Sequence, residues 1–174
     1  GIEKIKSGTA SFNGEELPLS PSDAWARSVA YIPGERRGEA LCLDMSARAN
    51  IVLPHLSKYG FFAKPWLENK DALELGGKVQ LKSNGVSQPV GQLSGGNQQK
   101  IVFARAIQDN PTLLLLDEPT RGVDIGAKYD IYLLVRELSA KGCAVILTST
   151  DLPEFLGMCD RVLVMQGGRQ AHFL

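Results

Sequence analysis

The second half of the chain carries two different hydrophobic patterns, and each predicts a different element. Segment 112–119 contains four consecutive leucines followed by two acids and a proline, an apolar run that is too short for a helix. A run without alternation is typical of a central parallel strand that is covered on both faces. Over 127–140, apolar residues instead recur every three or four positions and Gly142 follows, which predicts an amphipathic helix.

Shorter patterns predict further strands. Segment 29–34 is a short apolar strand that ends at a Pro-Gly pair, and 143–150 is expected to be another buried strand. Two hairpins are expected at turns that contain glycine, one at 13–14 and one at 167–168. Strands are therefore expected near both ends of the chain as well as in its middle.

Helices are expected between these strands. Segment 97–108 contains no breaker, and its apolar residues cover most faces, so this helix is expected to be buried. Ser46 is expected to cap a helix that runs through Ile51, and Asp151 a short helix later in the chain. Segment 54–92 contains several glycines and prolines and has weak periodicity, so we expect a smaller and more mobile subdomain there.

The order of these elements predicts an α/β fold with a mainly parallel sheet. We expect one domain with three parts: an N-terminal β segment over 1–45, a helical subdomain over 46–92 and an α/β part over 93–174. A chain of 174 residues is long enough to bury a core of its own.

Charge and cysteine content argue against several classes of protein. Nineteen Lys and Arg residues balance nineteen Asp and Glu residues, which does not fit a nucleic-acid-binding protein that relies on a strong basic field. Three cysteines without C-x-x-C spacing do not fit a disulfide framework or a zinc site, and His55 and His172 have no ligand partners at useful spacing. No apolar run approaches the roughly 18 residues of a membrane span.

Asp117 and Glu118 directly follow the leucine run. The carboxyl end of a parallel strand is where α/β sheets bind ligands. Asp117 could hold Mg2+, which takes one or two protein carboxylates, while Glu118 points another way and could orient or deprotonate a water. Pro119 is expected to hold Glu118 extended. A strand that simply ends in a polar turn is the alternative.

The segment LSGGNQQK, residues 93–100, precedes the predicted buried helix. Its glycines let the backbone approach a ligand closely, and the first turn of the helix has free N–H groups that favour an anion. Ser94 adds a hydroxyl donor. The alternative is a helix that binds nothing here and is capped by Ser94 or Asn97.

Together, LSGGNQQK, the apolar helix and LLLLDEPTRGVD resemble the ATP-binding cassette (ABC) ATPases. That resemblance implies a P-loop NTPase core with a helical subdomain. It makes Leu113–Asp117 the Walker B strand with Asp117 at Mg2+, Glu118 the catalytic glutamate, and Asp124 part of the D-loop. The residues that match the signature loop, which contacts the ATP held by a partner cassette, are Ser94, Gly95, Gly96, Asn97 and Gln98.

Longer stretches are similar to the second cassette of sugar importers of the ribose, xylose and galactose type. They include YIPGERRGEALCLDMSARANI and DEPTRGVDIGAKYDIY, and PTRGVD is more discriminating than LSGG. This resemblance implies ATP-driven uptake of a monosaccharide, with ATP and Mg2+, at the cytoplasmic face of the bacterial inner membrane. The implied partners are a second ABC cassette, an integral membrane sugar permease and, indirectly, a periplasmic sugar-binding protein, with no nucleic acid.

The sequence departs from the family pattern in three places. No G-x-x-x-x-G-K-[ST] loop occurs, so we expect an N-terminally truncated cassette that is inactive alone. Gly34 occupies the position of the Q-loop glutamine, and Thr150 that of the switch histidine. The strand that accompanies the missing loop is expected to pair near the leucine run, so an unpaired apolar edge there predicts poor solubility or self-association.

Two other functions stay open at this point. The chain could be a catalytically silent half that supplies only its signature loop, or a soluble ABC protein of translation or DNA repair. The second function predicts a basic stripe, which the sequence does not show. Arg36 and Arg37 are expected in a solvated loop, with a contact to the permease as the alternative.

Overall fold

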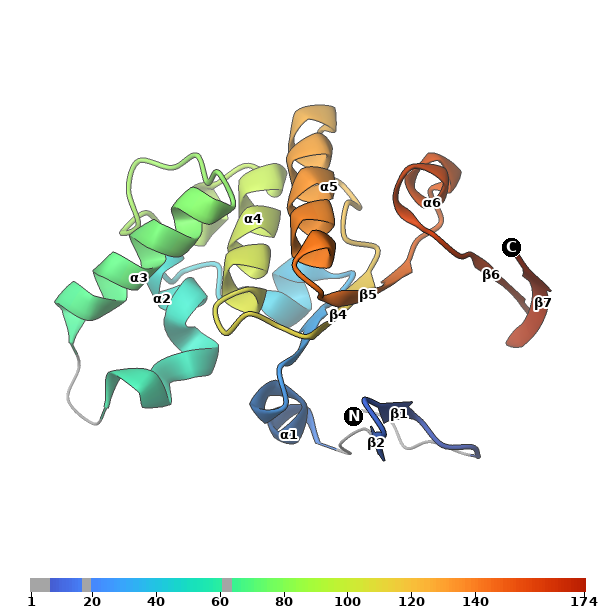
Figure 1. Cartoon of the computed structure of the whole chain (residues 1–174). Helices are drawn as coiled ribbons and strands as arrows, with labels where there is room; N and C mark the ends of the chain where they lie inside the picture. The colour runs from blue at the N-terminus through green and yellow to red at the C-terminus, as the bar shows by residue number, and fades with distance from the viewer. Residues whose placement is uncertain (1–6, 17–19, 61–63) are drawn as a thin grey trace.

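A three-stranded parallel sheet forms the centre of the protein (Figure 1). Its strands are β3 (Val29–Ile32), β4 (Leu113–Asp117) and β5 (Ala144–Thr148). The computed structural model describes residues 7–16, 20–60 and 64–174. The leucine-rich strand β4 lies in the middle and pairs in parallel with both neighbours, which confirms the predicted α/β fold.

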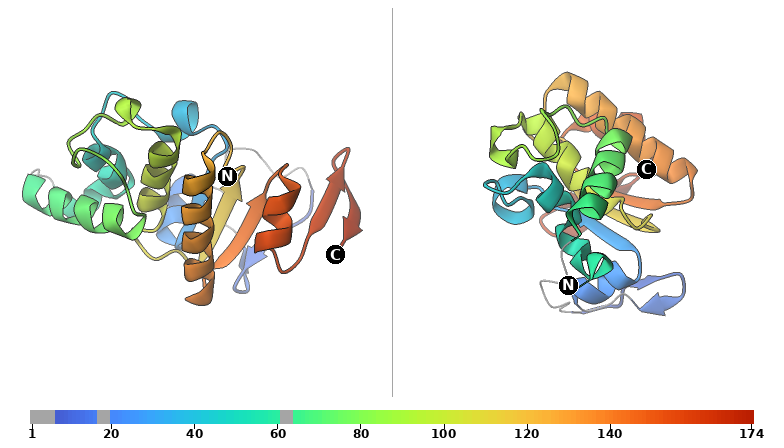
Figure 2. Two further views of the ribbon diagram at one scale, coloured as in Figure 1. Left: turned by 90° about the horizontal axis from the view of Figure 1, so that it is seen from above. Right: turned by 90° about the vertical axis from the view of Figure 1, so that its left-hand side faces the viewer.

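Helices pack against this sheet and extend beyond it. Helices α4 (Gly95–Ala106) and α5 (Ile125–Ala140) contact the sheet and each other. Beyond α4 lie α2 (Ala47–Val52) and α3 (Pro65–Lys78), which pack against each other and against α4 (Figure 2). The three-part division of the chain stays a prediction, because the helices of 46–92 pack directly on α4.

The remaining elements are short. Both predicted hairpins are confirmed, since β1 pairs antiparallel with β2 and β6 with β7. Among the helices of the described segments, none combines the length and apolar character that a membrane span requires. The short remaining elements are β1 (Ser11–Phe12), β2 (Glu15–Glu16), α1 (Pro21–Ala26), the π-helix η1 (Arg36–Ala40), the 3-10 helices η2 (Leu53–Tyr59) and η3 (Val90–Gln92), α6 (Leu152–Met158), β6 (Leu163–Gln166) and β7 (Arg169–Phe173).

Helix α4 is buried on most of its faces, as predicted. Even Lys100 is only 4% exposed. Its ammonium donates to Asp130 Oδ2 at 2.6 Å and to the carbonyl of Gln80 at 3.0 Å. A buried ammonium requires such partners, because an unpaired charge in the interior costs several kcal/mol. The pair therefore ties α4 to α5 and to the turn that follows α3.

Capping residues determine where the helices begin. Both α4 and α5 start two residues earlier than predicted, because Ser94 and Asp124 each accept a hydrogen bond from the backbone N–H three residues later. Ser46 caps α2 in the predicted way. Asp151 precedes α6 as predicted, but its carboxylate makes no capping bond and pairs instead with Lys128 at 2.9 Å.

The prediction that 143–150 forms a buried strand is wrong for β5. Its side chains alternate between exposed and half-buried, and Ile146 is 57% exposed. Val145 and Leu147 pack against the core, whereas the other face of the strand is open. By contrast, Leu114 and Leu116 of the central strand are 0% and 2% exposed. Apolar composition is the same in both strands, and the difference comes from what covers them.

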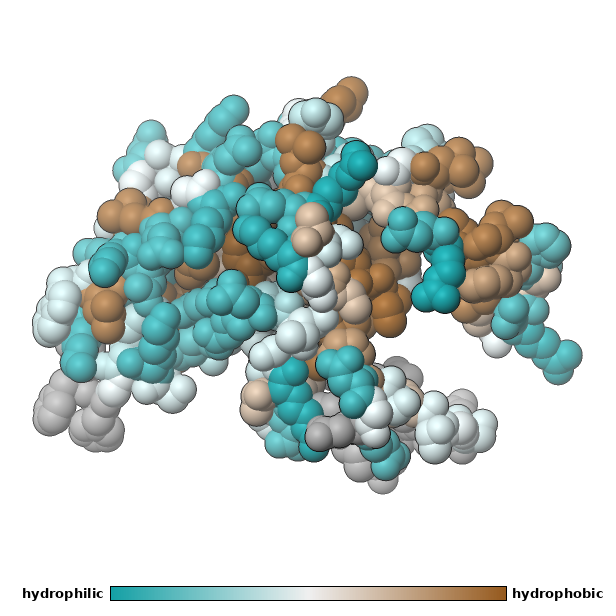
Figure 3. Space-filling model, viewed as in Figure 1, coloured by the Kyte–Doolittle hydropathy of each residue, from teal (hydrophilic) through white to brown (hydrophobic). Residues whose placement is uncertain are grey.

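An unpaired apolar edge was predicted near the leucine run, and β5, the strand next to β4, has such an edge among the described strands. β4 is paired on both sides, so the sheet ends at β3 on one side and at β5 on the other, and β5 carries the exposed apolar face. Apolar side chains continue from there over α6 and the hairpin β6–β7 (Figure 3). Exposed residues on these elements include Leu152, Leu156, Leu163, Met165 and Phe173.

We expect the 174-residue chain by itself to self-associate at micromolar concentrations, because an apolar strand with a free edge pairs readily with a second copy. Ile146→Lys places a charge on the open face of β5 and should shift the chain toward monomer. Leu133→Lys, on the exposed side of α5, is the matched control and should not. Size-exclusion chromatography with light scattering measures both. A wild-type monomer that melts cooperatively at these concentrations would contradict this expectation.

Candidate functional site

Four segments meet at the carboxyl-terminal edge of the sheet. They are the loop after β3, the start of α4, the loop from β4 to α5, and the end of β5. Backbone and side-chain contacts join all four. In α/β folds this edge is where ligands bind, because the loops that follow parallel strands converge there.

Asp117 lies at the end of β4 and is held from two sides. Thr148 on β5 donates its hydroxyl to Asp117 Oδ1 at 2.6 Å. The other oxygen, Oδ2, faces Gly34, where a Cβ would lie 3.4 Å away. The described residues contain no cluster of three or more His, Cys, Asp or Glu side chains that could cage a metal. One oriented carboxylate fits Mg2+ delivered with a nucleotide, because that ion takes few protein ligands and keeps phosphate oxygens and water.

Glu118 corrects one prediction. Its backbone is left-handed, with φ at 43°, rather than extended. The Glu118 N–H donates to the carbonyl of Thr148 at 2.8 Å, and the carbonyl of Glu118 accepts from Arg121 N–H at 3.1 Å. Pro119 disfavours the right-handed helical region for the residue before it. The chain must nevertheless reverse here, so Glu118 takes the left-handed conformation, at a cost of about 1–3 kcal/mol.

Ser94 is the N-cap of α4. Its Oγ accepts from the backbone N–H of Asn97 at 3.4 Å and from Asn97 Nδ2 at 2.9 Å. Asn97 Oδ1 in turn accepts from the backbone N–H of Lys82 at 2.8 Å. Both bonds to Ser94 use its oxygen as acceptor, so its hydroxyl proton stays available as a donor. Capping and ligand binding are therefore compatible at this residue.

The signature glycines leave room for neighbours that any side chain would displace. A Cβ at Gly95 would lie 2.8 Å from Arg36 Nη2 and 3.0 Å from the carbonyl of Gly122. A Cβ at Gly96 would lie 2.5 Å from the Cβ of Ala127 and 2.9 Å from Asp124 Oδ2. These glycines therefore have a packing role: they bring the starts of α4 and α5 into direct contact.

Gln98 is fully buried and its amide is bonded within the chain. Nε2 donates to the carbonyls of Val90 and Leu93, both at 3.2 Å, and Oε1 accepts from Arg37 Nε at 3.2 Å. In this conformation Gln98 supports the loop and has no polar group left for a nucleotide. Arg37 is exposed on its loop, and its Nε reaches this buried amide from the solvent side.

The last two predicted positions lie on the open side of the site. Asp124 is exposed and caps α5, with Oδ1 accepting from Ala127 N–H at 3.0 Å. Thr150 is exposed at the bend after β5. The segment after it is anchored by Lys128, whose pKa is raised mainly by its hydrogen bond to Asp151. The buried Glu154 of α6 accepts a hydrogen bond from Thr120 at 3.0 Å.

The sequence did not predict the contacts of two residues at this edge. Thr148 holds the carboxylate of Asp117, and only the register of β4 against β5 places them opposite each other. Arg36 donates to the backbone carbonyls of Arg121 and Gly122 rather than lying in a solvated loop. No local pattern marks either residue, because both act on partners far away in the sequence.

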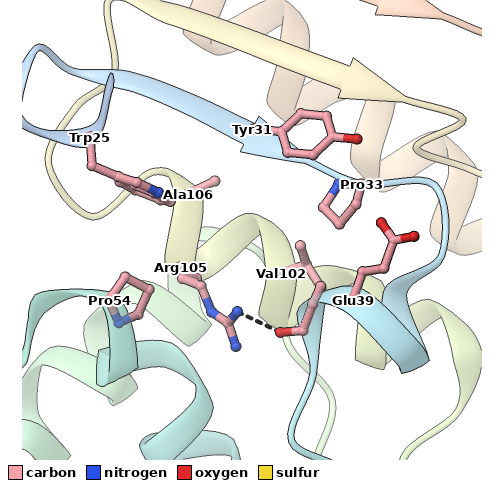
Figure 4. Close-up of a pocket in the computed structure, with 9 residues that line it drawn as sticks. Trp25, Tyr31, Pro33, Glu39, Pro54, Val102, Arg105 and Ala106 are labelled. Carbon is pink, nitrogen blue, oxygen red and sulfur yellow. Dashed lines mark hydrogen bonds between the residues drawn. The ribbon is translucent and has the colours of Figure 1, made fainter. Parts of the chain in front are cut away.

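A cavity of about 410 Å3 lies between α1, β3, the loop after β3 and the second half of α4 (Figure 4). Arg105 borders it and donates to the carbonyls of Ala40 and Asn50. Burial lowers the pKa of Arg105. The cavity shares no residue with the predicted site. Its lining comprises Trp25, Tyr31, Pro33, Glu39, Ala40, Pro54, Val102, Arg105 and Ala106.

Curated proteins with similar sequences are sugar import ATP-binding proteins. The chain is 44% identical to the ribose import ATP-binding protein RbsA of Lactococcus lactis subsp. cremoris over 179 residues, which cover all of this chain and 36% of RbsA. It is 43% identical to the xylose import ATP-binding protein XylG of Moorella thermoacetica, over 97% of this chain and 34% of XylG. The chain thus spans about a third of these relatives.

Solved structures and a family model agree with this likeness. An ATP-binding cassette in a dimeric, post-hydrolysis state with ADP and Pi has a TM-score of 0.81 at 22% identity, over 99% of this chain and 75% of that one. At that identity the likeness shows the fold, which is that of an ATP-binding cassette. The family model described as ABC transporter matches residues 1–121. The chain therefore belongs to the ABC transporter family.

Proposed function

We propose that the chain is part of the second ATPase cassette of a monosaccharide importer and acts on MgATP together with an opposing cassette. The sugar import functions of RbsA and XylG support the transport role. The observation that carries the proposal is that Ser94, Asp117 and Glu118 lie at one edge of the sheet, where contacts join their loops. Their spacing along the chain alone would permit many other arrangements.

The two groups of residues serve different nucleotides. The first turn of α4 presents N–H groups and the Ser94 hydroxyl, which suit the phosphates of a nucleotide held by the opposing cassette. Asp117 and Glu118 suit a nucleotide held beside β4 by a P-loop, and the 174 residues contain no such loop motif. Signature function and hydrolytic function of this cassette can therefore be measured separately.

Each residue of the hydrolytic group has a defined task in this proposal. Asp117, oriented by Thr148, holds Mg2+ and its shell of water and phosphate oxygens. Glu118 orients the attacking water and accepts its proton. Gly34 contributes no amide, and Thr150 is too short to do the work of an imidazole, so fewer polar groups surround the phosphates here.

The partners follow from the same proposal. A second ABC cassette completes each nucleotide site, and an integral membrane sugar permease receives the resulting motion. A periplasmic sugar-binding protein delivers the substrate to that permease. The chain would then work at the cytoplasmic face of the bacterial inner membrane.

Substitutions at Ser94 distinguish phosphate binding from capping alone. Ser94→Ala removes both the cap and the donor, whereas Ser94→Asp keeps a good cap but places a negative charge where phosphate would bind. In the natural protein that contains this chain, we expect both variants to lower kcat/KM for MgATP about tenfold or more, the loss of a hydrogen bond to a charged group. Steady-state ATPase kinetics measure this.

Stability measurements complete that test. Ser94→Ala should lower the free energy of unfolding by about 1 kcal/mol, and Ser94→Asp should leave it nearly unchanged. Ser83→Ala, an exposed serine outside the site, is the control. If Ser94→Asp hydrolyses MgATP like the wild type, Ser94 is only a helix cap and the proposal fails.

A further inference from the structure

Arg36, the first residue of η1, connects three segments of the site. Its Nη1 donates to the carbonyl of Arg121 at 2.6 Å, and its Nη2 donates to the carbonyl of Gly122 at 3.1 Å. The same Nη2 occupies the space beside Gly95, where a Cβ would lie 2.8 Å away. One guanidinium therefore touches the loop between β4 and α5 and the start of α4, while its own backbone belongs to the loop after β3.

The loop that Arg36 binds consists of two successive turns. Arg121 N–H donates to the carbonyl of Glu118 at 3.1 Å, and Val123 N–H donates to the carbonyl of Thr120 at 3.2 Å. These bonds leave the next two carbonyls, those of Arg121 and Gly122, for the guanidinium. The first turn begins at Glu118, whose backbone is strained. Contacts that hold this loop therefore also help to fix the backbone that orients the Glu118 carboxylate.

The choice of arginine fits this geometry. A guanidinium is a planar fork whose parallel N–H groups can satisfy two neighbouring carbonyls, whereas a lysine ammonium is a point charge on a flexible stem. Burial lowers the pKa of Arg36, yet a guanidinium stays charged at neutral pH. Two residues before it, Gly34 packs against the Asp117 carboxylate. Segment 34–36 therefore contacts both Asp117, the acid proposed to hold Mg2+, and Gly95 of the signature loop.

We propose that Arg36 is a positioning residue for the ATPase reaction, which holds the 118–124 loop against the start of α4 so that Ser94 and Glu118 keep fixed orientations within one cassette. This inference rests on the proposed function for its kinetic part. Arg36 does not touch the nucleotide in this role. It acts through the backbone carbonyls of Arg121 and Gly122 and through its contact with Gly95.

The test compares Arg36→Ala and Arg36→Lys with Arg136→Ala in the natural protein that contains this chain. Arg136 is exposed on α5, so its loss controls for charge. We expect both Arg36 variants to lower kcat for MgATP by about 10- to 100-fold with a smaller change in KM, the usual consequence of misplaced catalytic groups. Arg36→Lys should not rescue the rate, because it keeps the charge and loses the fork.

Amide hydrogen exchange measures how firmly Arg36 holds the 118–124 loop, and it requires no ATP. Exchange at Arg121 and Val123, whose N–H groups are hydrogen-bonded within the two turns of this loop, should become at least tenfold faster in both Arg36 variants, while exchange at Leu75 in α3 stays unchanged. Faster exchange with unchanged kcat would reduce Arg36 to a structural contact and overturn the inference, as would unchanged exchange. A wild-type protein without ATPase activity would instead contradict the proposed function. In that case the exchange measurement still tests the inference by itself, because unchanged exchange in the Arg36 variants would show that Arg36 does not hold the 118–124 loop.

Discussion

Replacement of Glu118 by glutamine is expected to lower MgATP hydrolysis by about 10²- to 10⁴-fold, the usual contribution of a positioned general base. The amide keeps the size of the side chain but cannot accept the proton of the attacking water. Nucleotide binding should be nearly unchanged, because Asp117 and its bond from Thr148 are preserved. Single-turnover hydrolysis and nucleotide-binding measurements on the natural protein that contains this chain separate the two effects.

A second substitution distinguishes the chemistry of Glu118 from its backbone. Asparagine tolerates the left-handed region better than glutamate does. Glu118→Asn should be as inactive as Glu118→Gln, because it also lacks the carboxylate. It should nevertheless raise the free energy of unfolding by up to about 1 kcal/mol, because the left-handed backbone is less strained. Glu74→Gln, on the exposed face of α3, should change neither property. If Glu118→Gln keeps half of the wild-type rate, another group is the base.

Gly96→Ala is expected to lower the free energy of unfolding of the 174-residue chain by about 1–3 kcal/mol. The added methyl would lie 2.5 Å from the Cβ of Ala127 and 2.9 Å from Asp124 Oδ2, so the starts of α4 and α5 must separate. The Cβ of Ala127 is fixed to the backbone of α5, and the Asp124 carboxylate is held by its capping bond from Ala127 N–H. Urea denaturation of the purified chain measures the loss.

Gly126→Ala is the matched control for this prediction. Gly126 occupies the same early position in α5, but a Cβ there meets only Asp124 Oδ1, at 3.4 Å. It should leave stability unchanged or raise it by up to about 1 kcal/mol, the gain of alanine over glycine in a helix. Equal stabilities for Gly96→Ala and Gly126→Ala would show that the two helix starts are not in close contact.

Elements with strong local patterns were predictable from the sequence. The leucine run predicted β4, and helical spacing predicted α5, because the periodicity of each element is written into neighbouring residues. The predicted starts of the helices were less accurate. The bonds from Asn97 to Ser94 and from Ala127 to Asp124 extend each helix toward its cap, and the apolar pattern does not include the cap.

The burial of β5 was not predictable in the same way. Its apolar composition resembles that of β4, and only the tertiary arrangement leaves one face and one edge open. Glu118 shows a related difficulty. The following proline disfavours one backbone region and leaves two others, and the bond to Thr148, which lies on a different strand, decides between them.

The sequence predicted which residues belong to part of the candidate site, but it did not predict the contacts between them. Motif spacing predicted the candidate residues from Ser94 to Asp124, and their roles remain predictions. The bonds that hold them join residues far apart in sequence: 31 positions between Asp117 and Thr148, and 85 between Arg36 and Arg121. Neither periodicity nor motif matching carries information about such pairs.

Helix α4 runs from the signature loop to the cavity bordered by Arg105. Its 12 residues span about 18 Å. A hydrogen-bonded helix of this length is stiff, and its burial on most faces prevents it from bending freely. We therefore expect a displacement of the cavity wall at Val102 or Ala106 to move the Ser94 end as well. The ion pair between Lys100 and Asp130 fastens the middle of this stiff helix to α5.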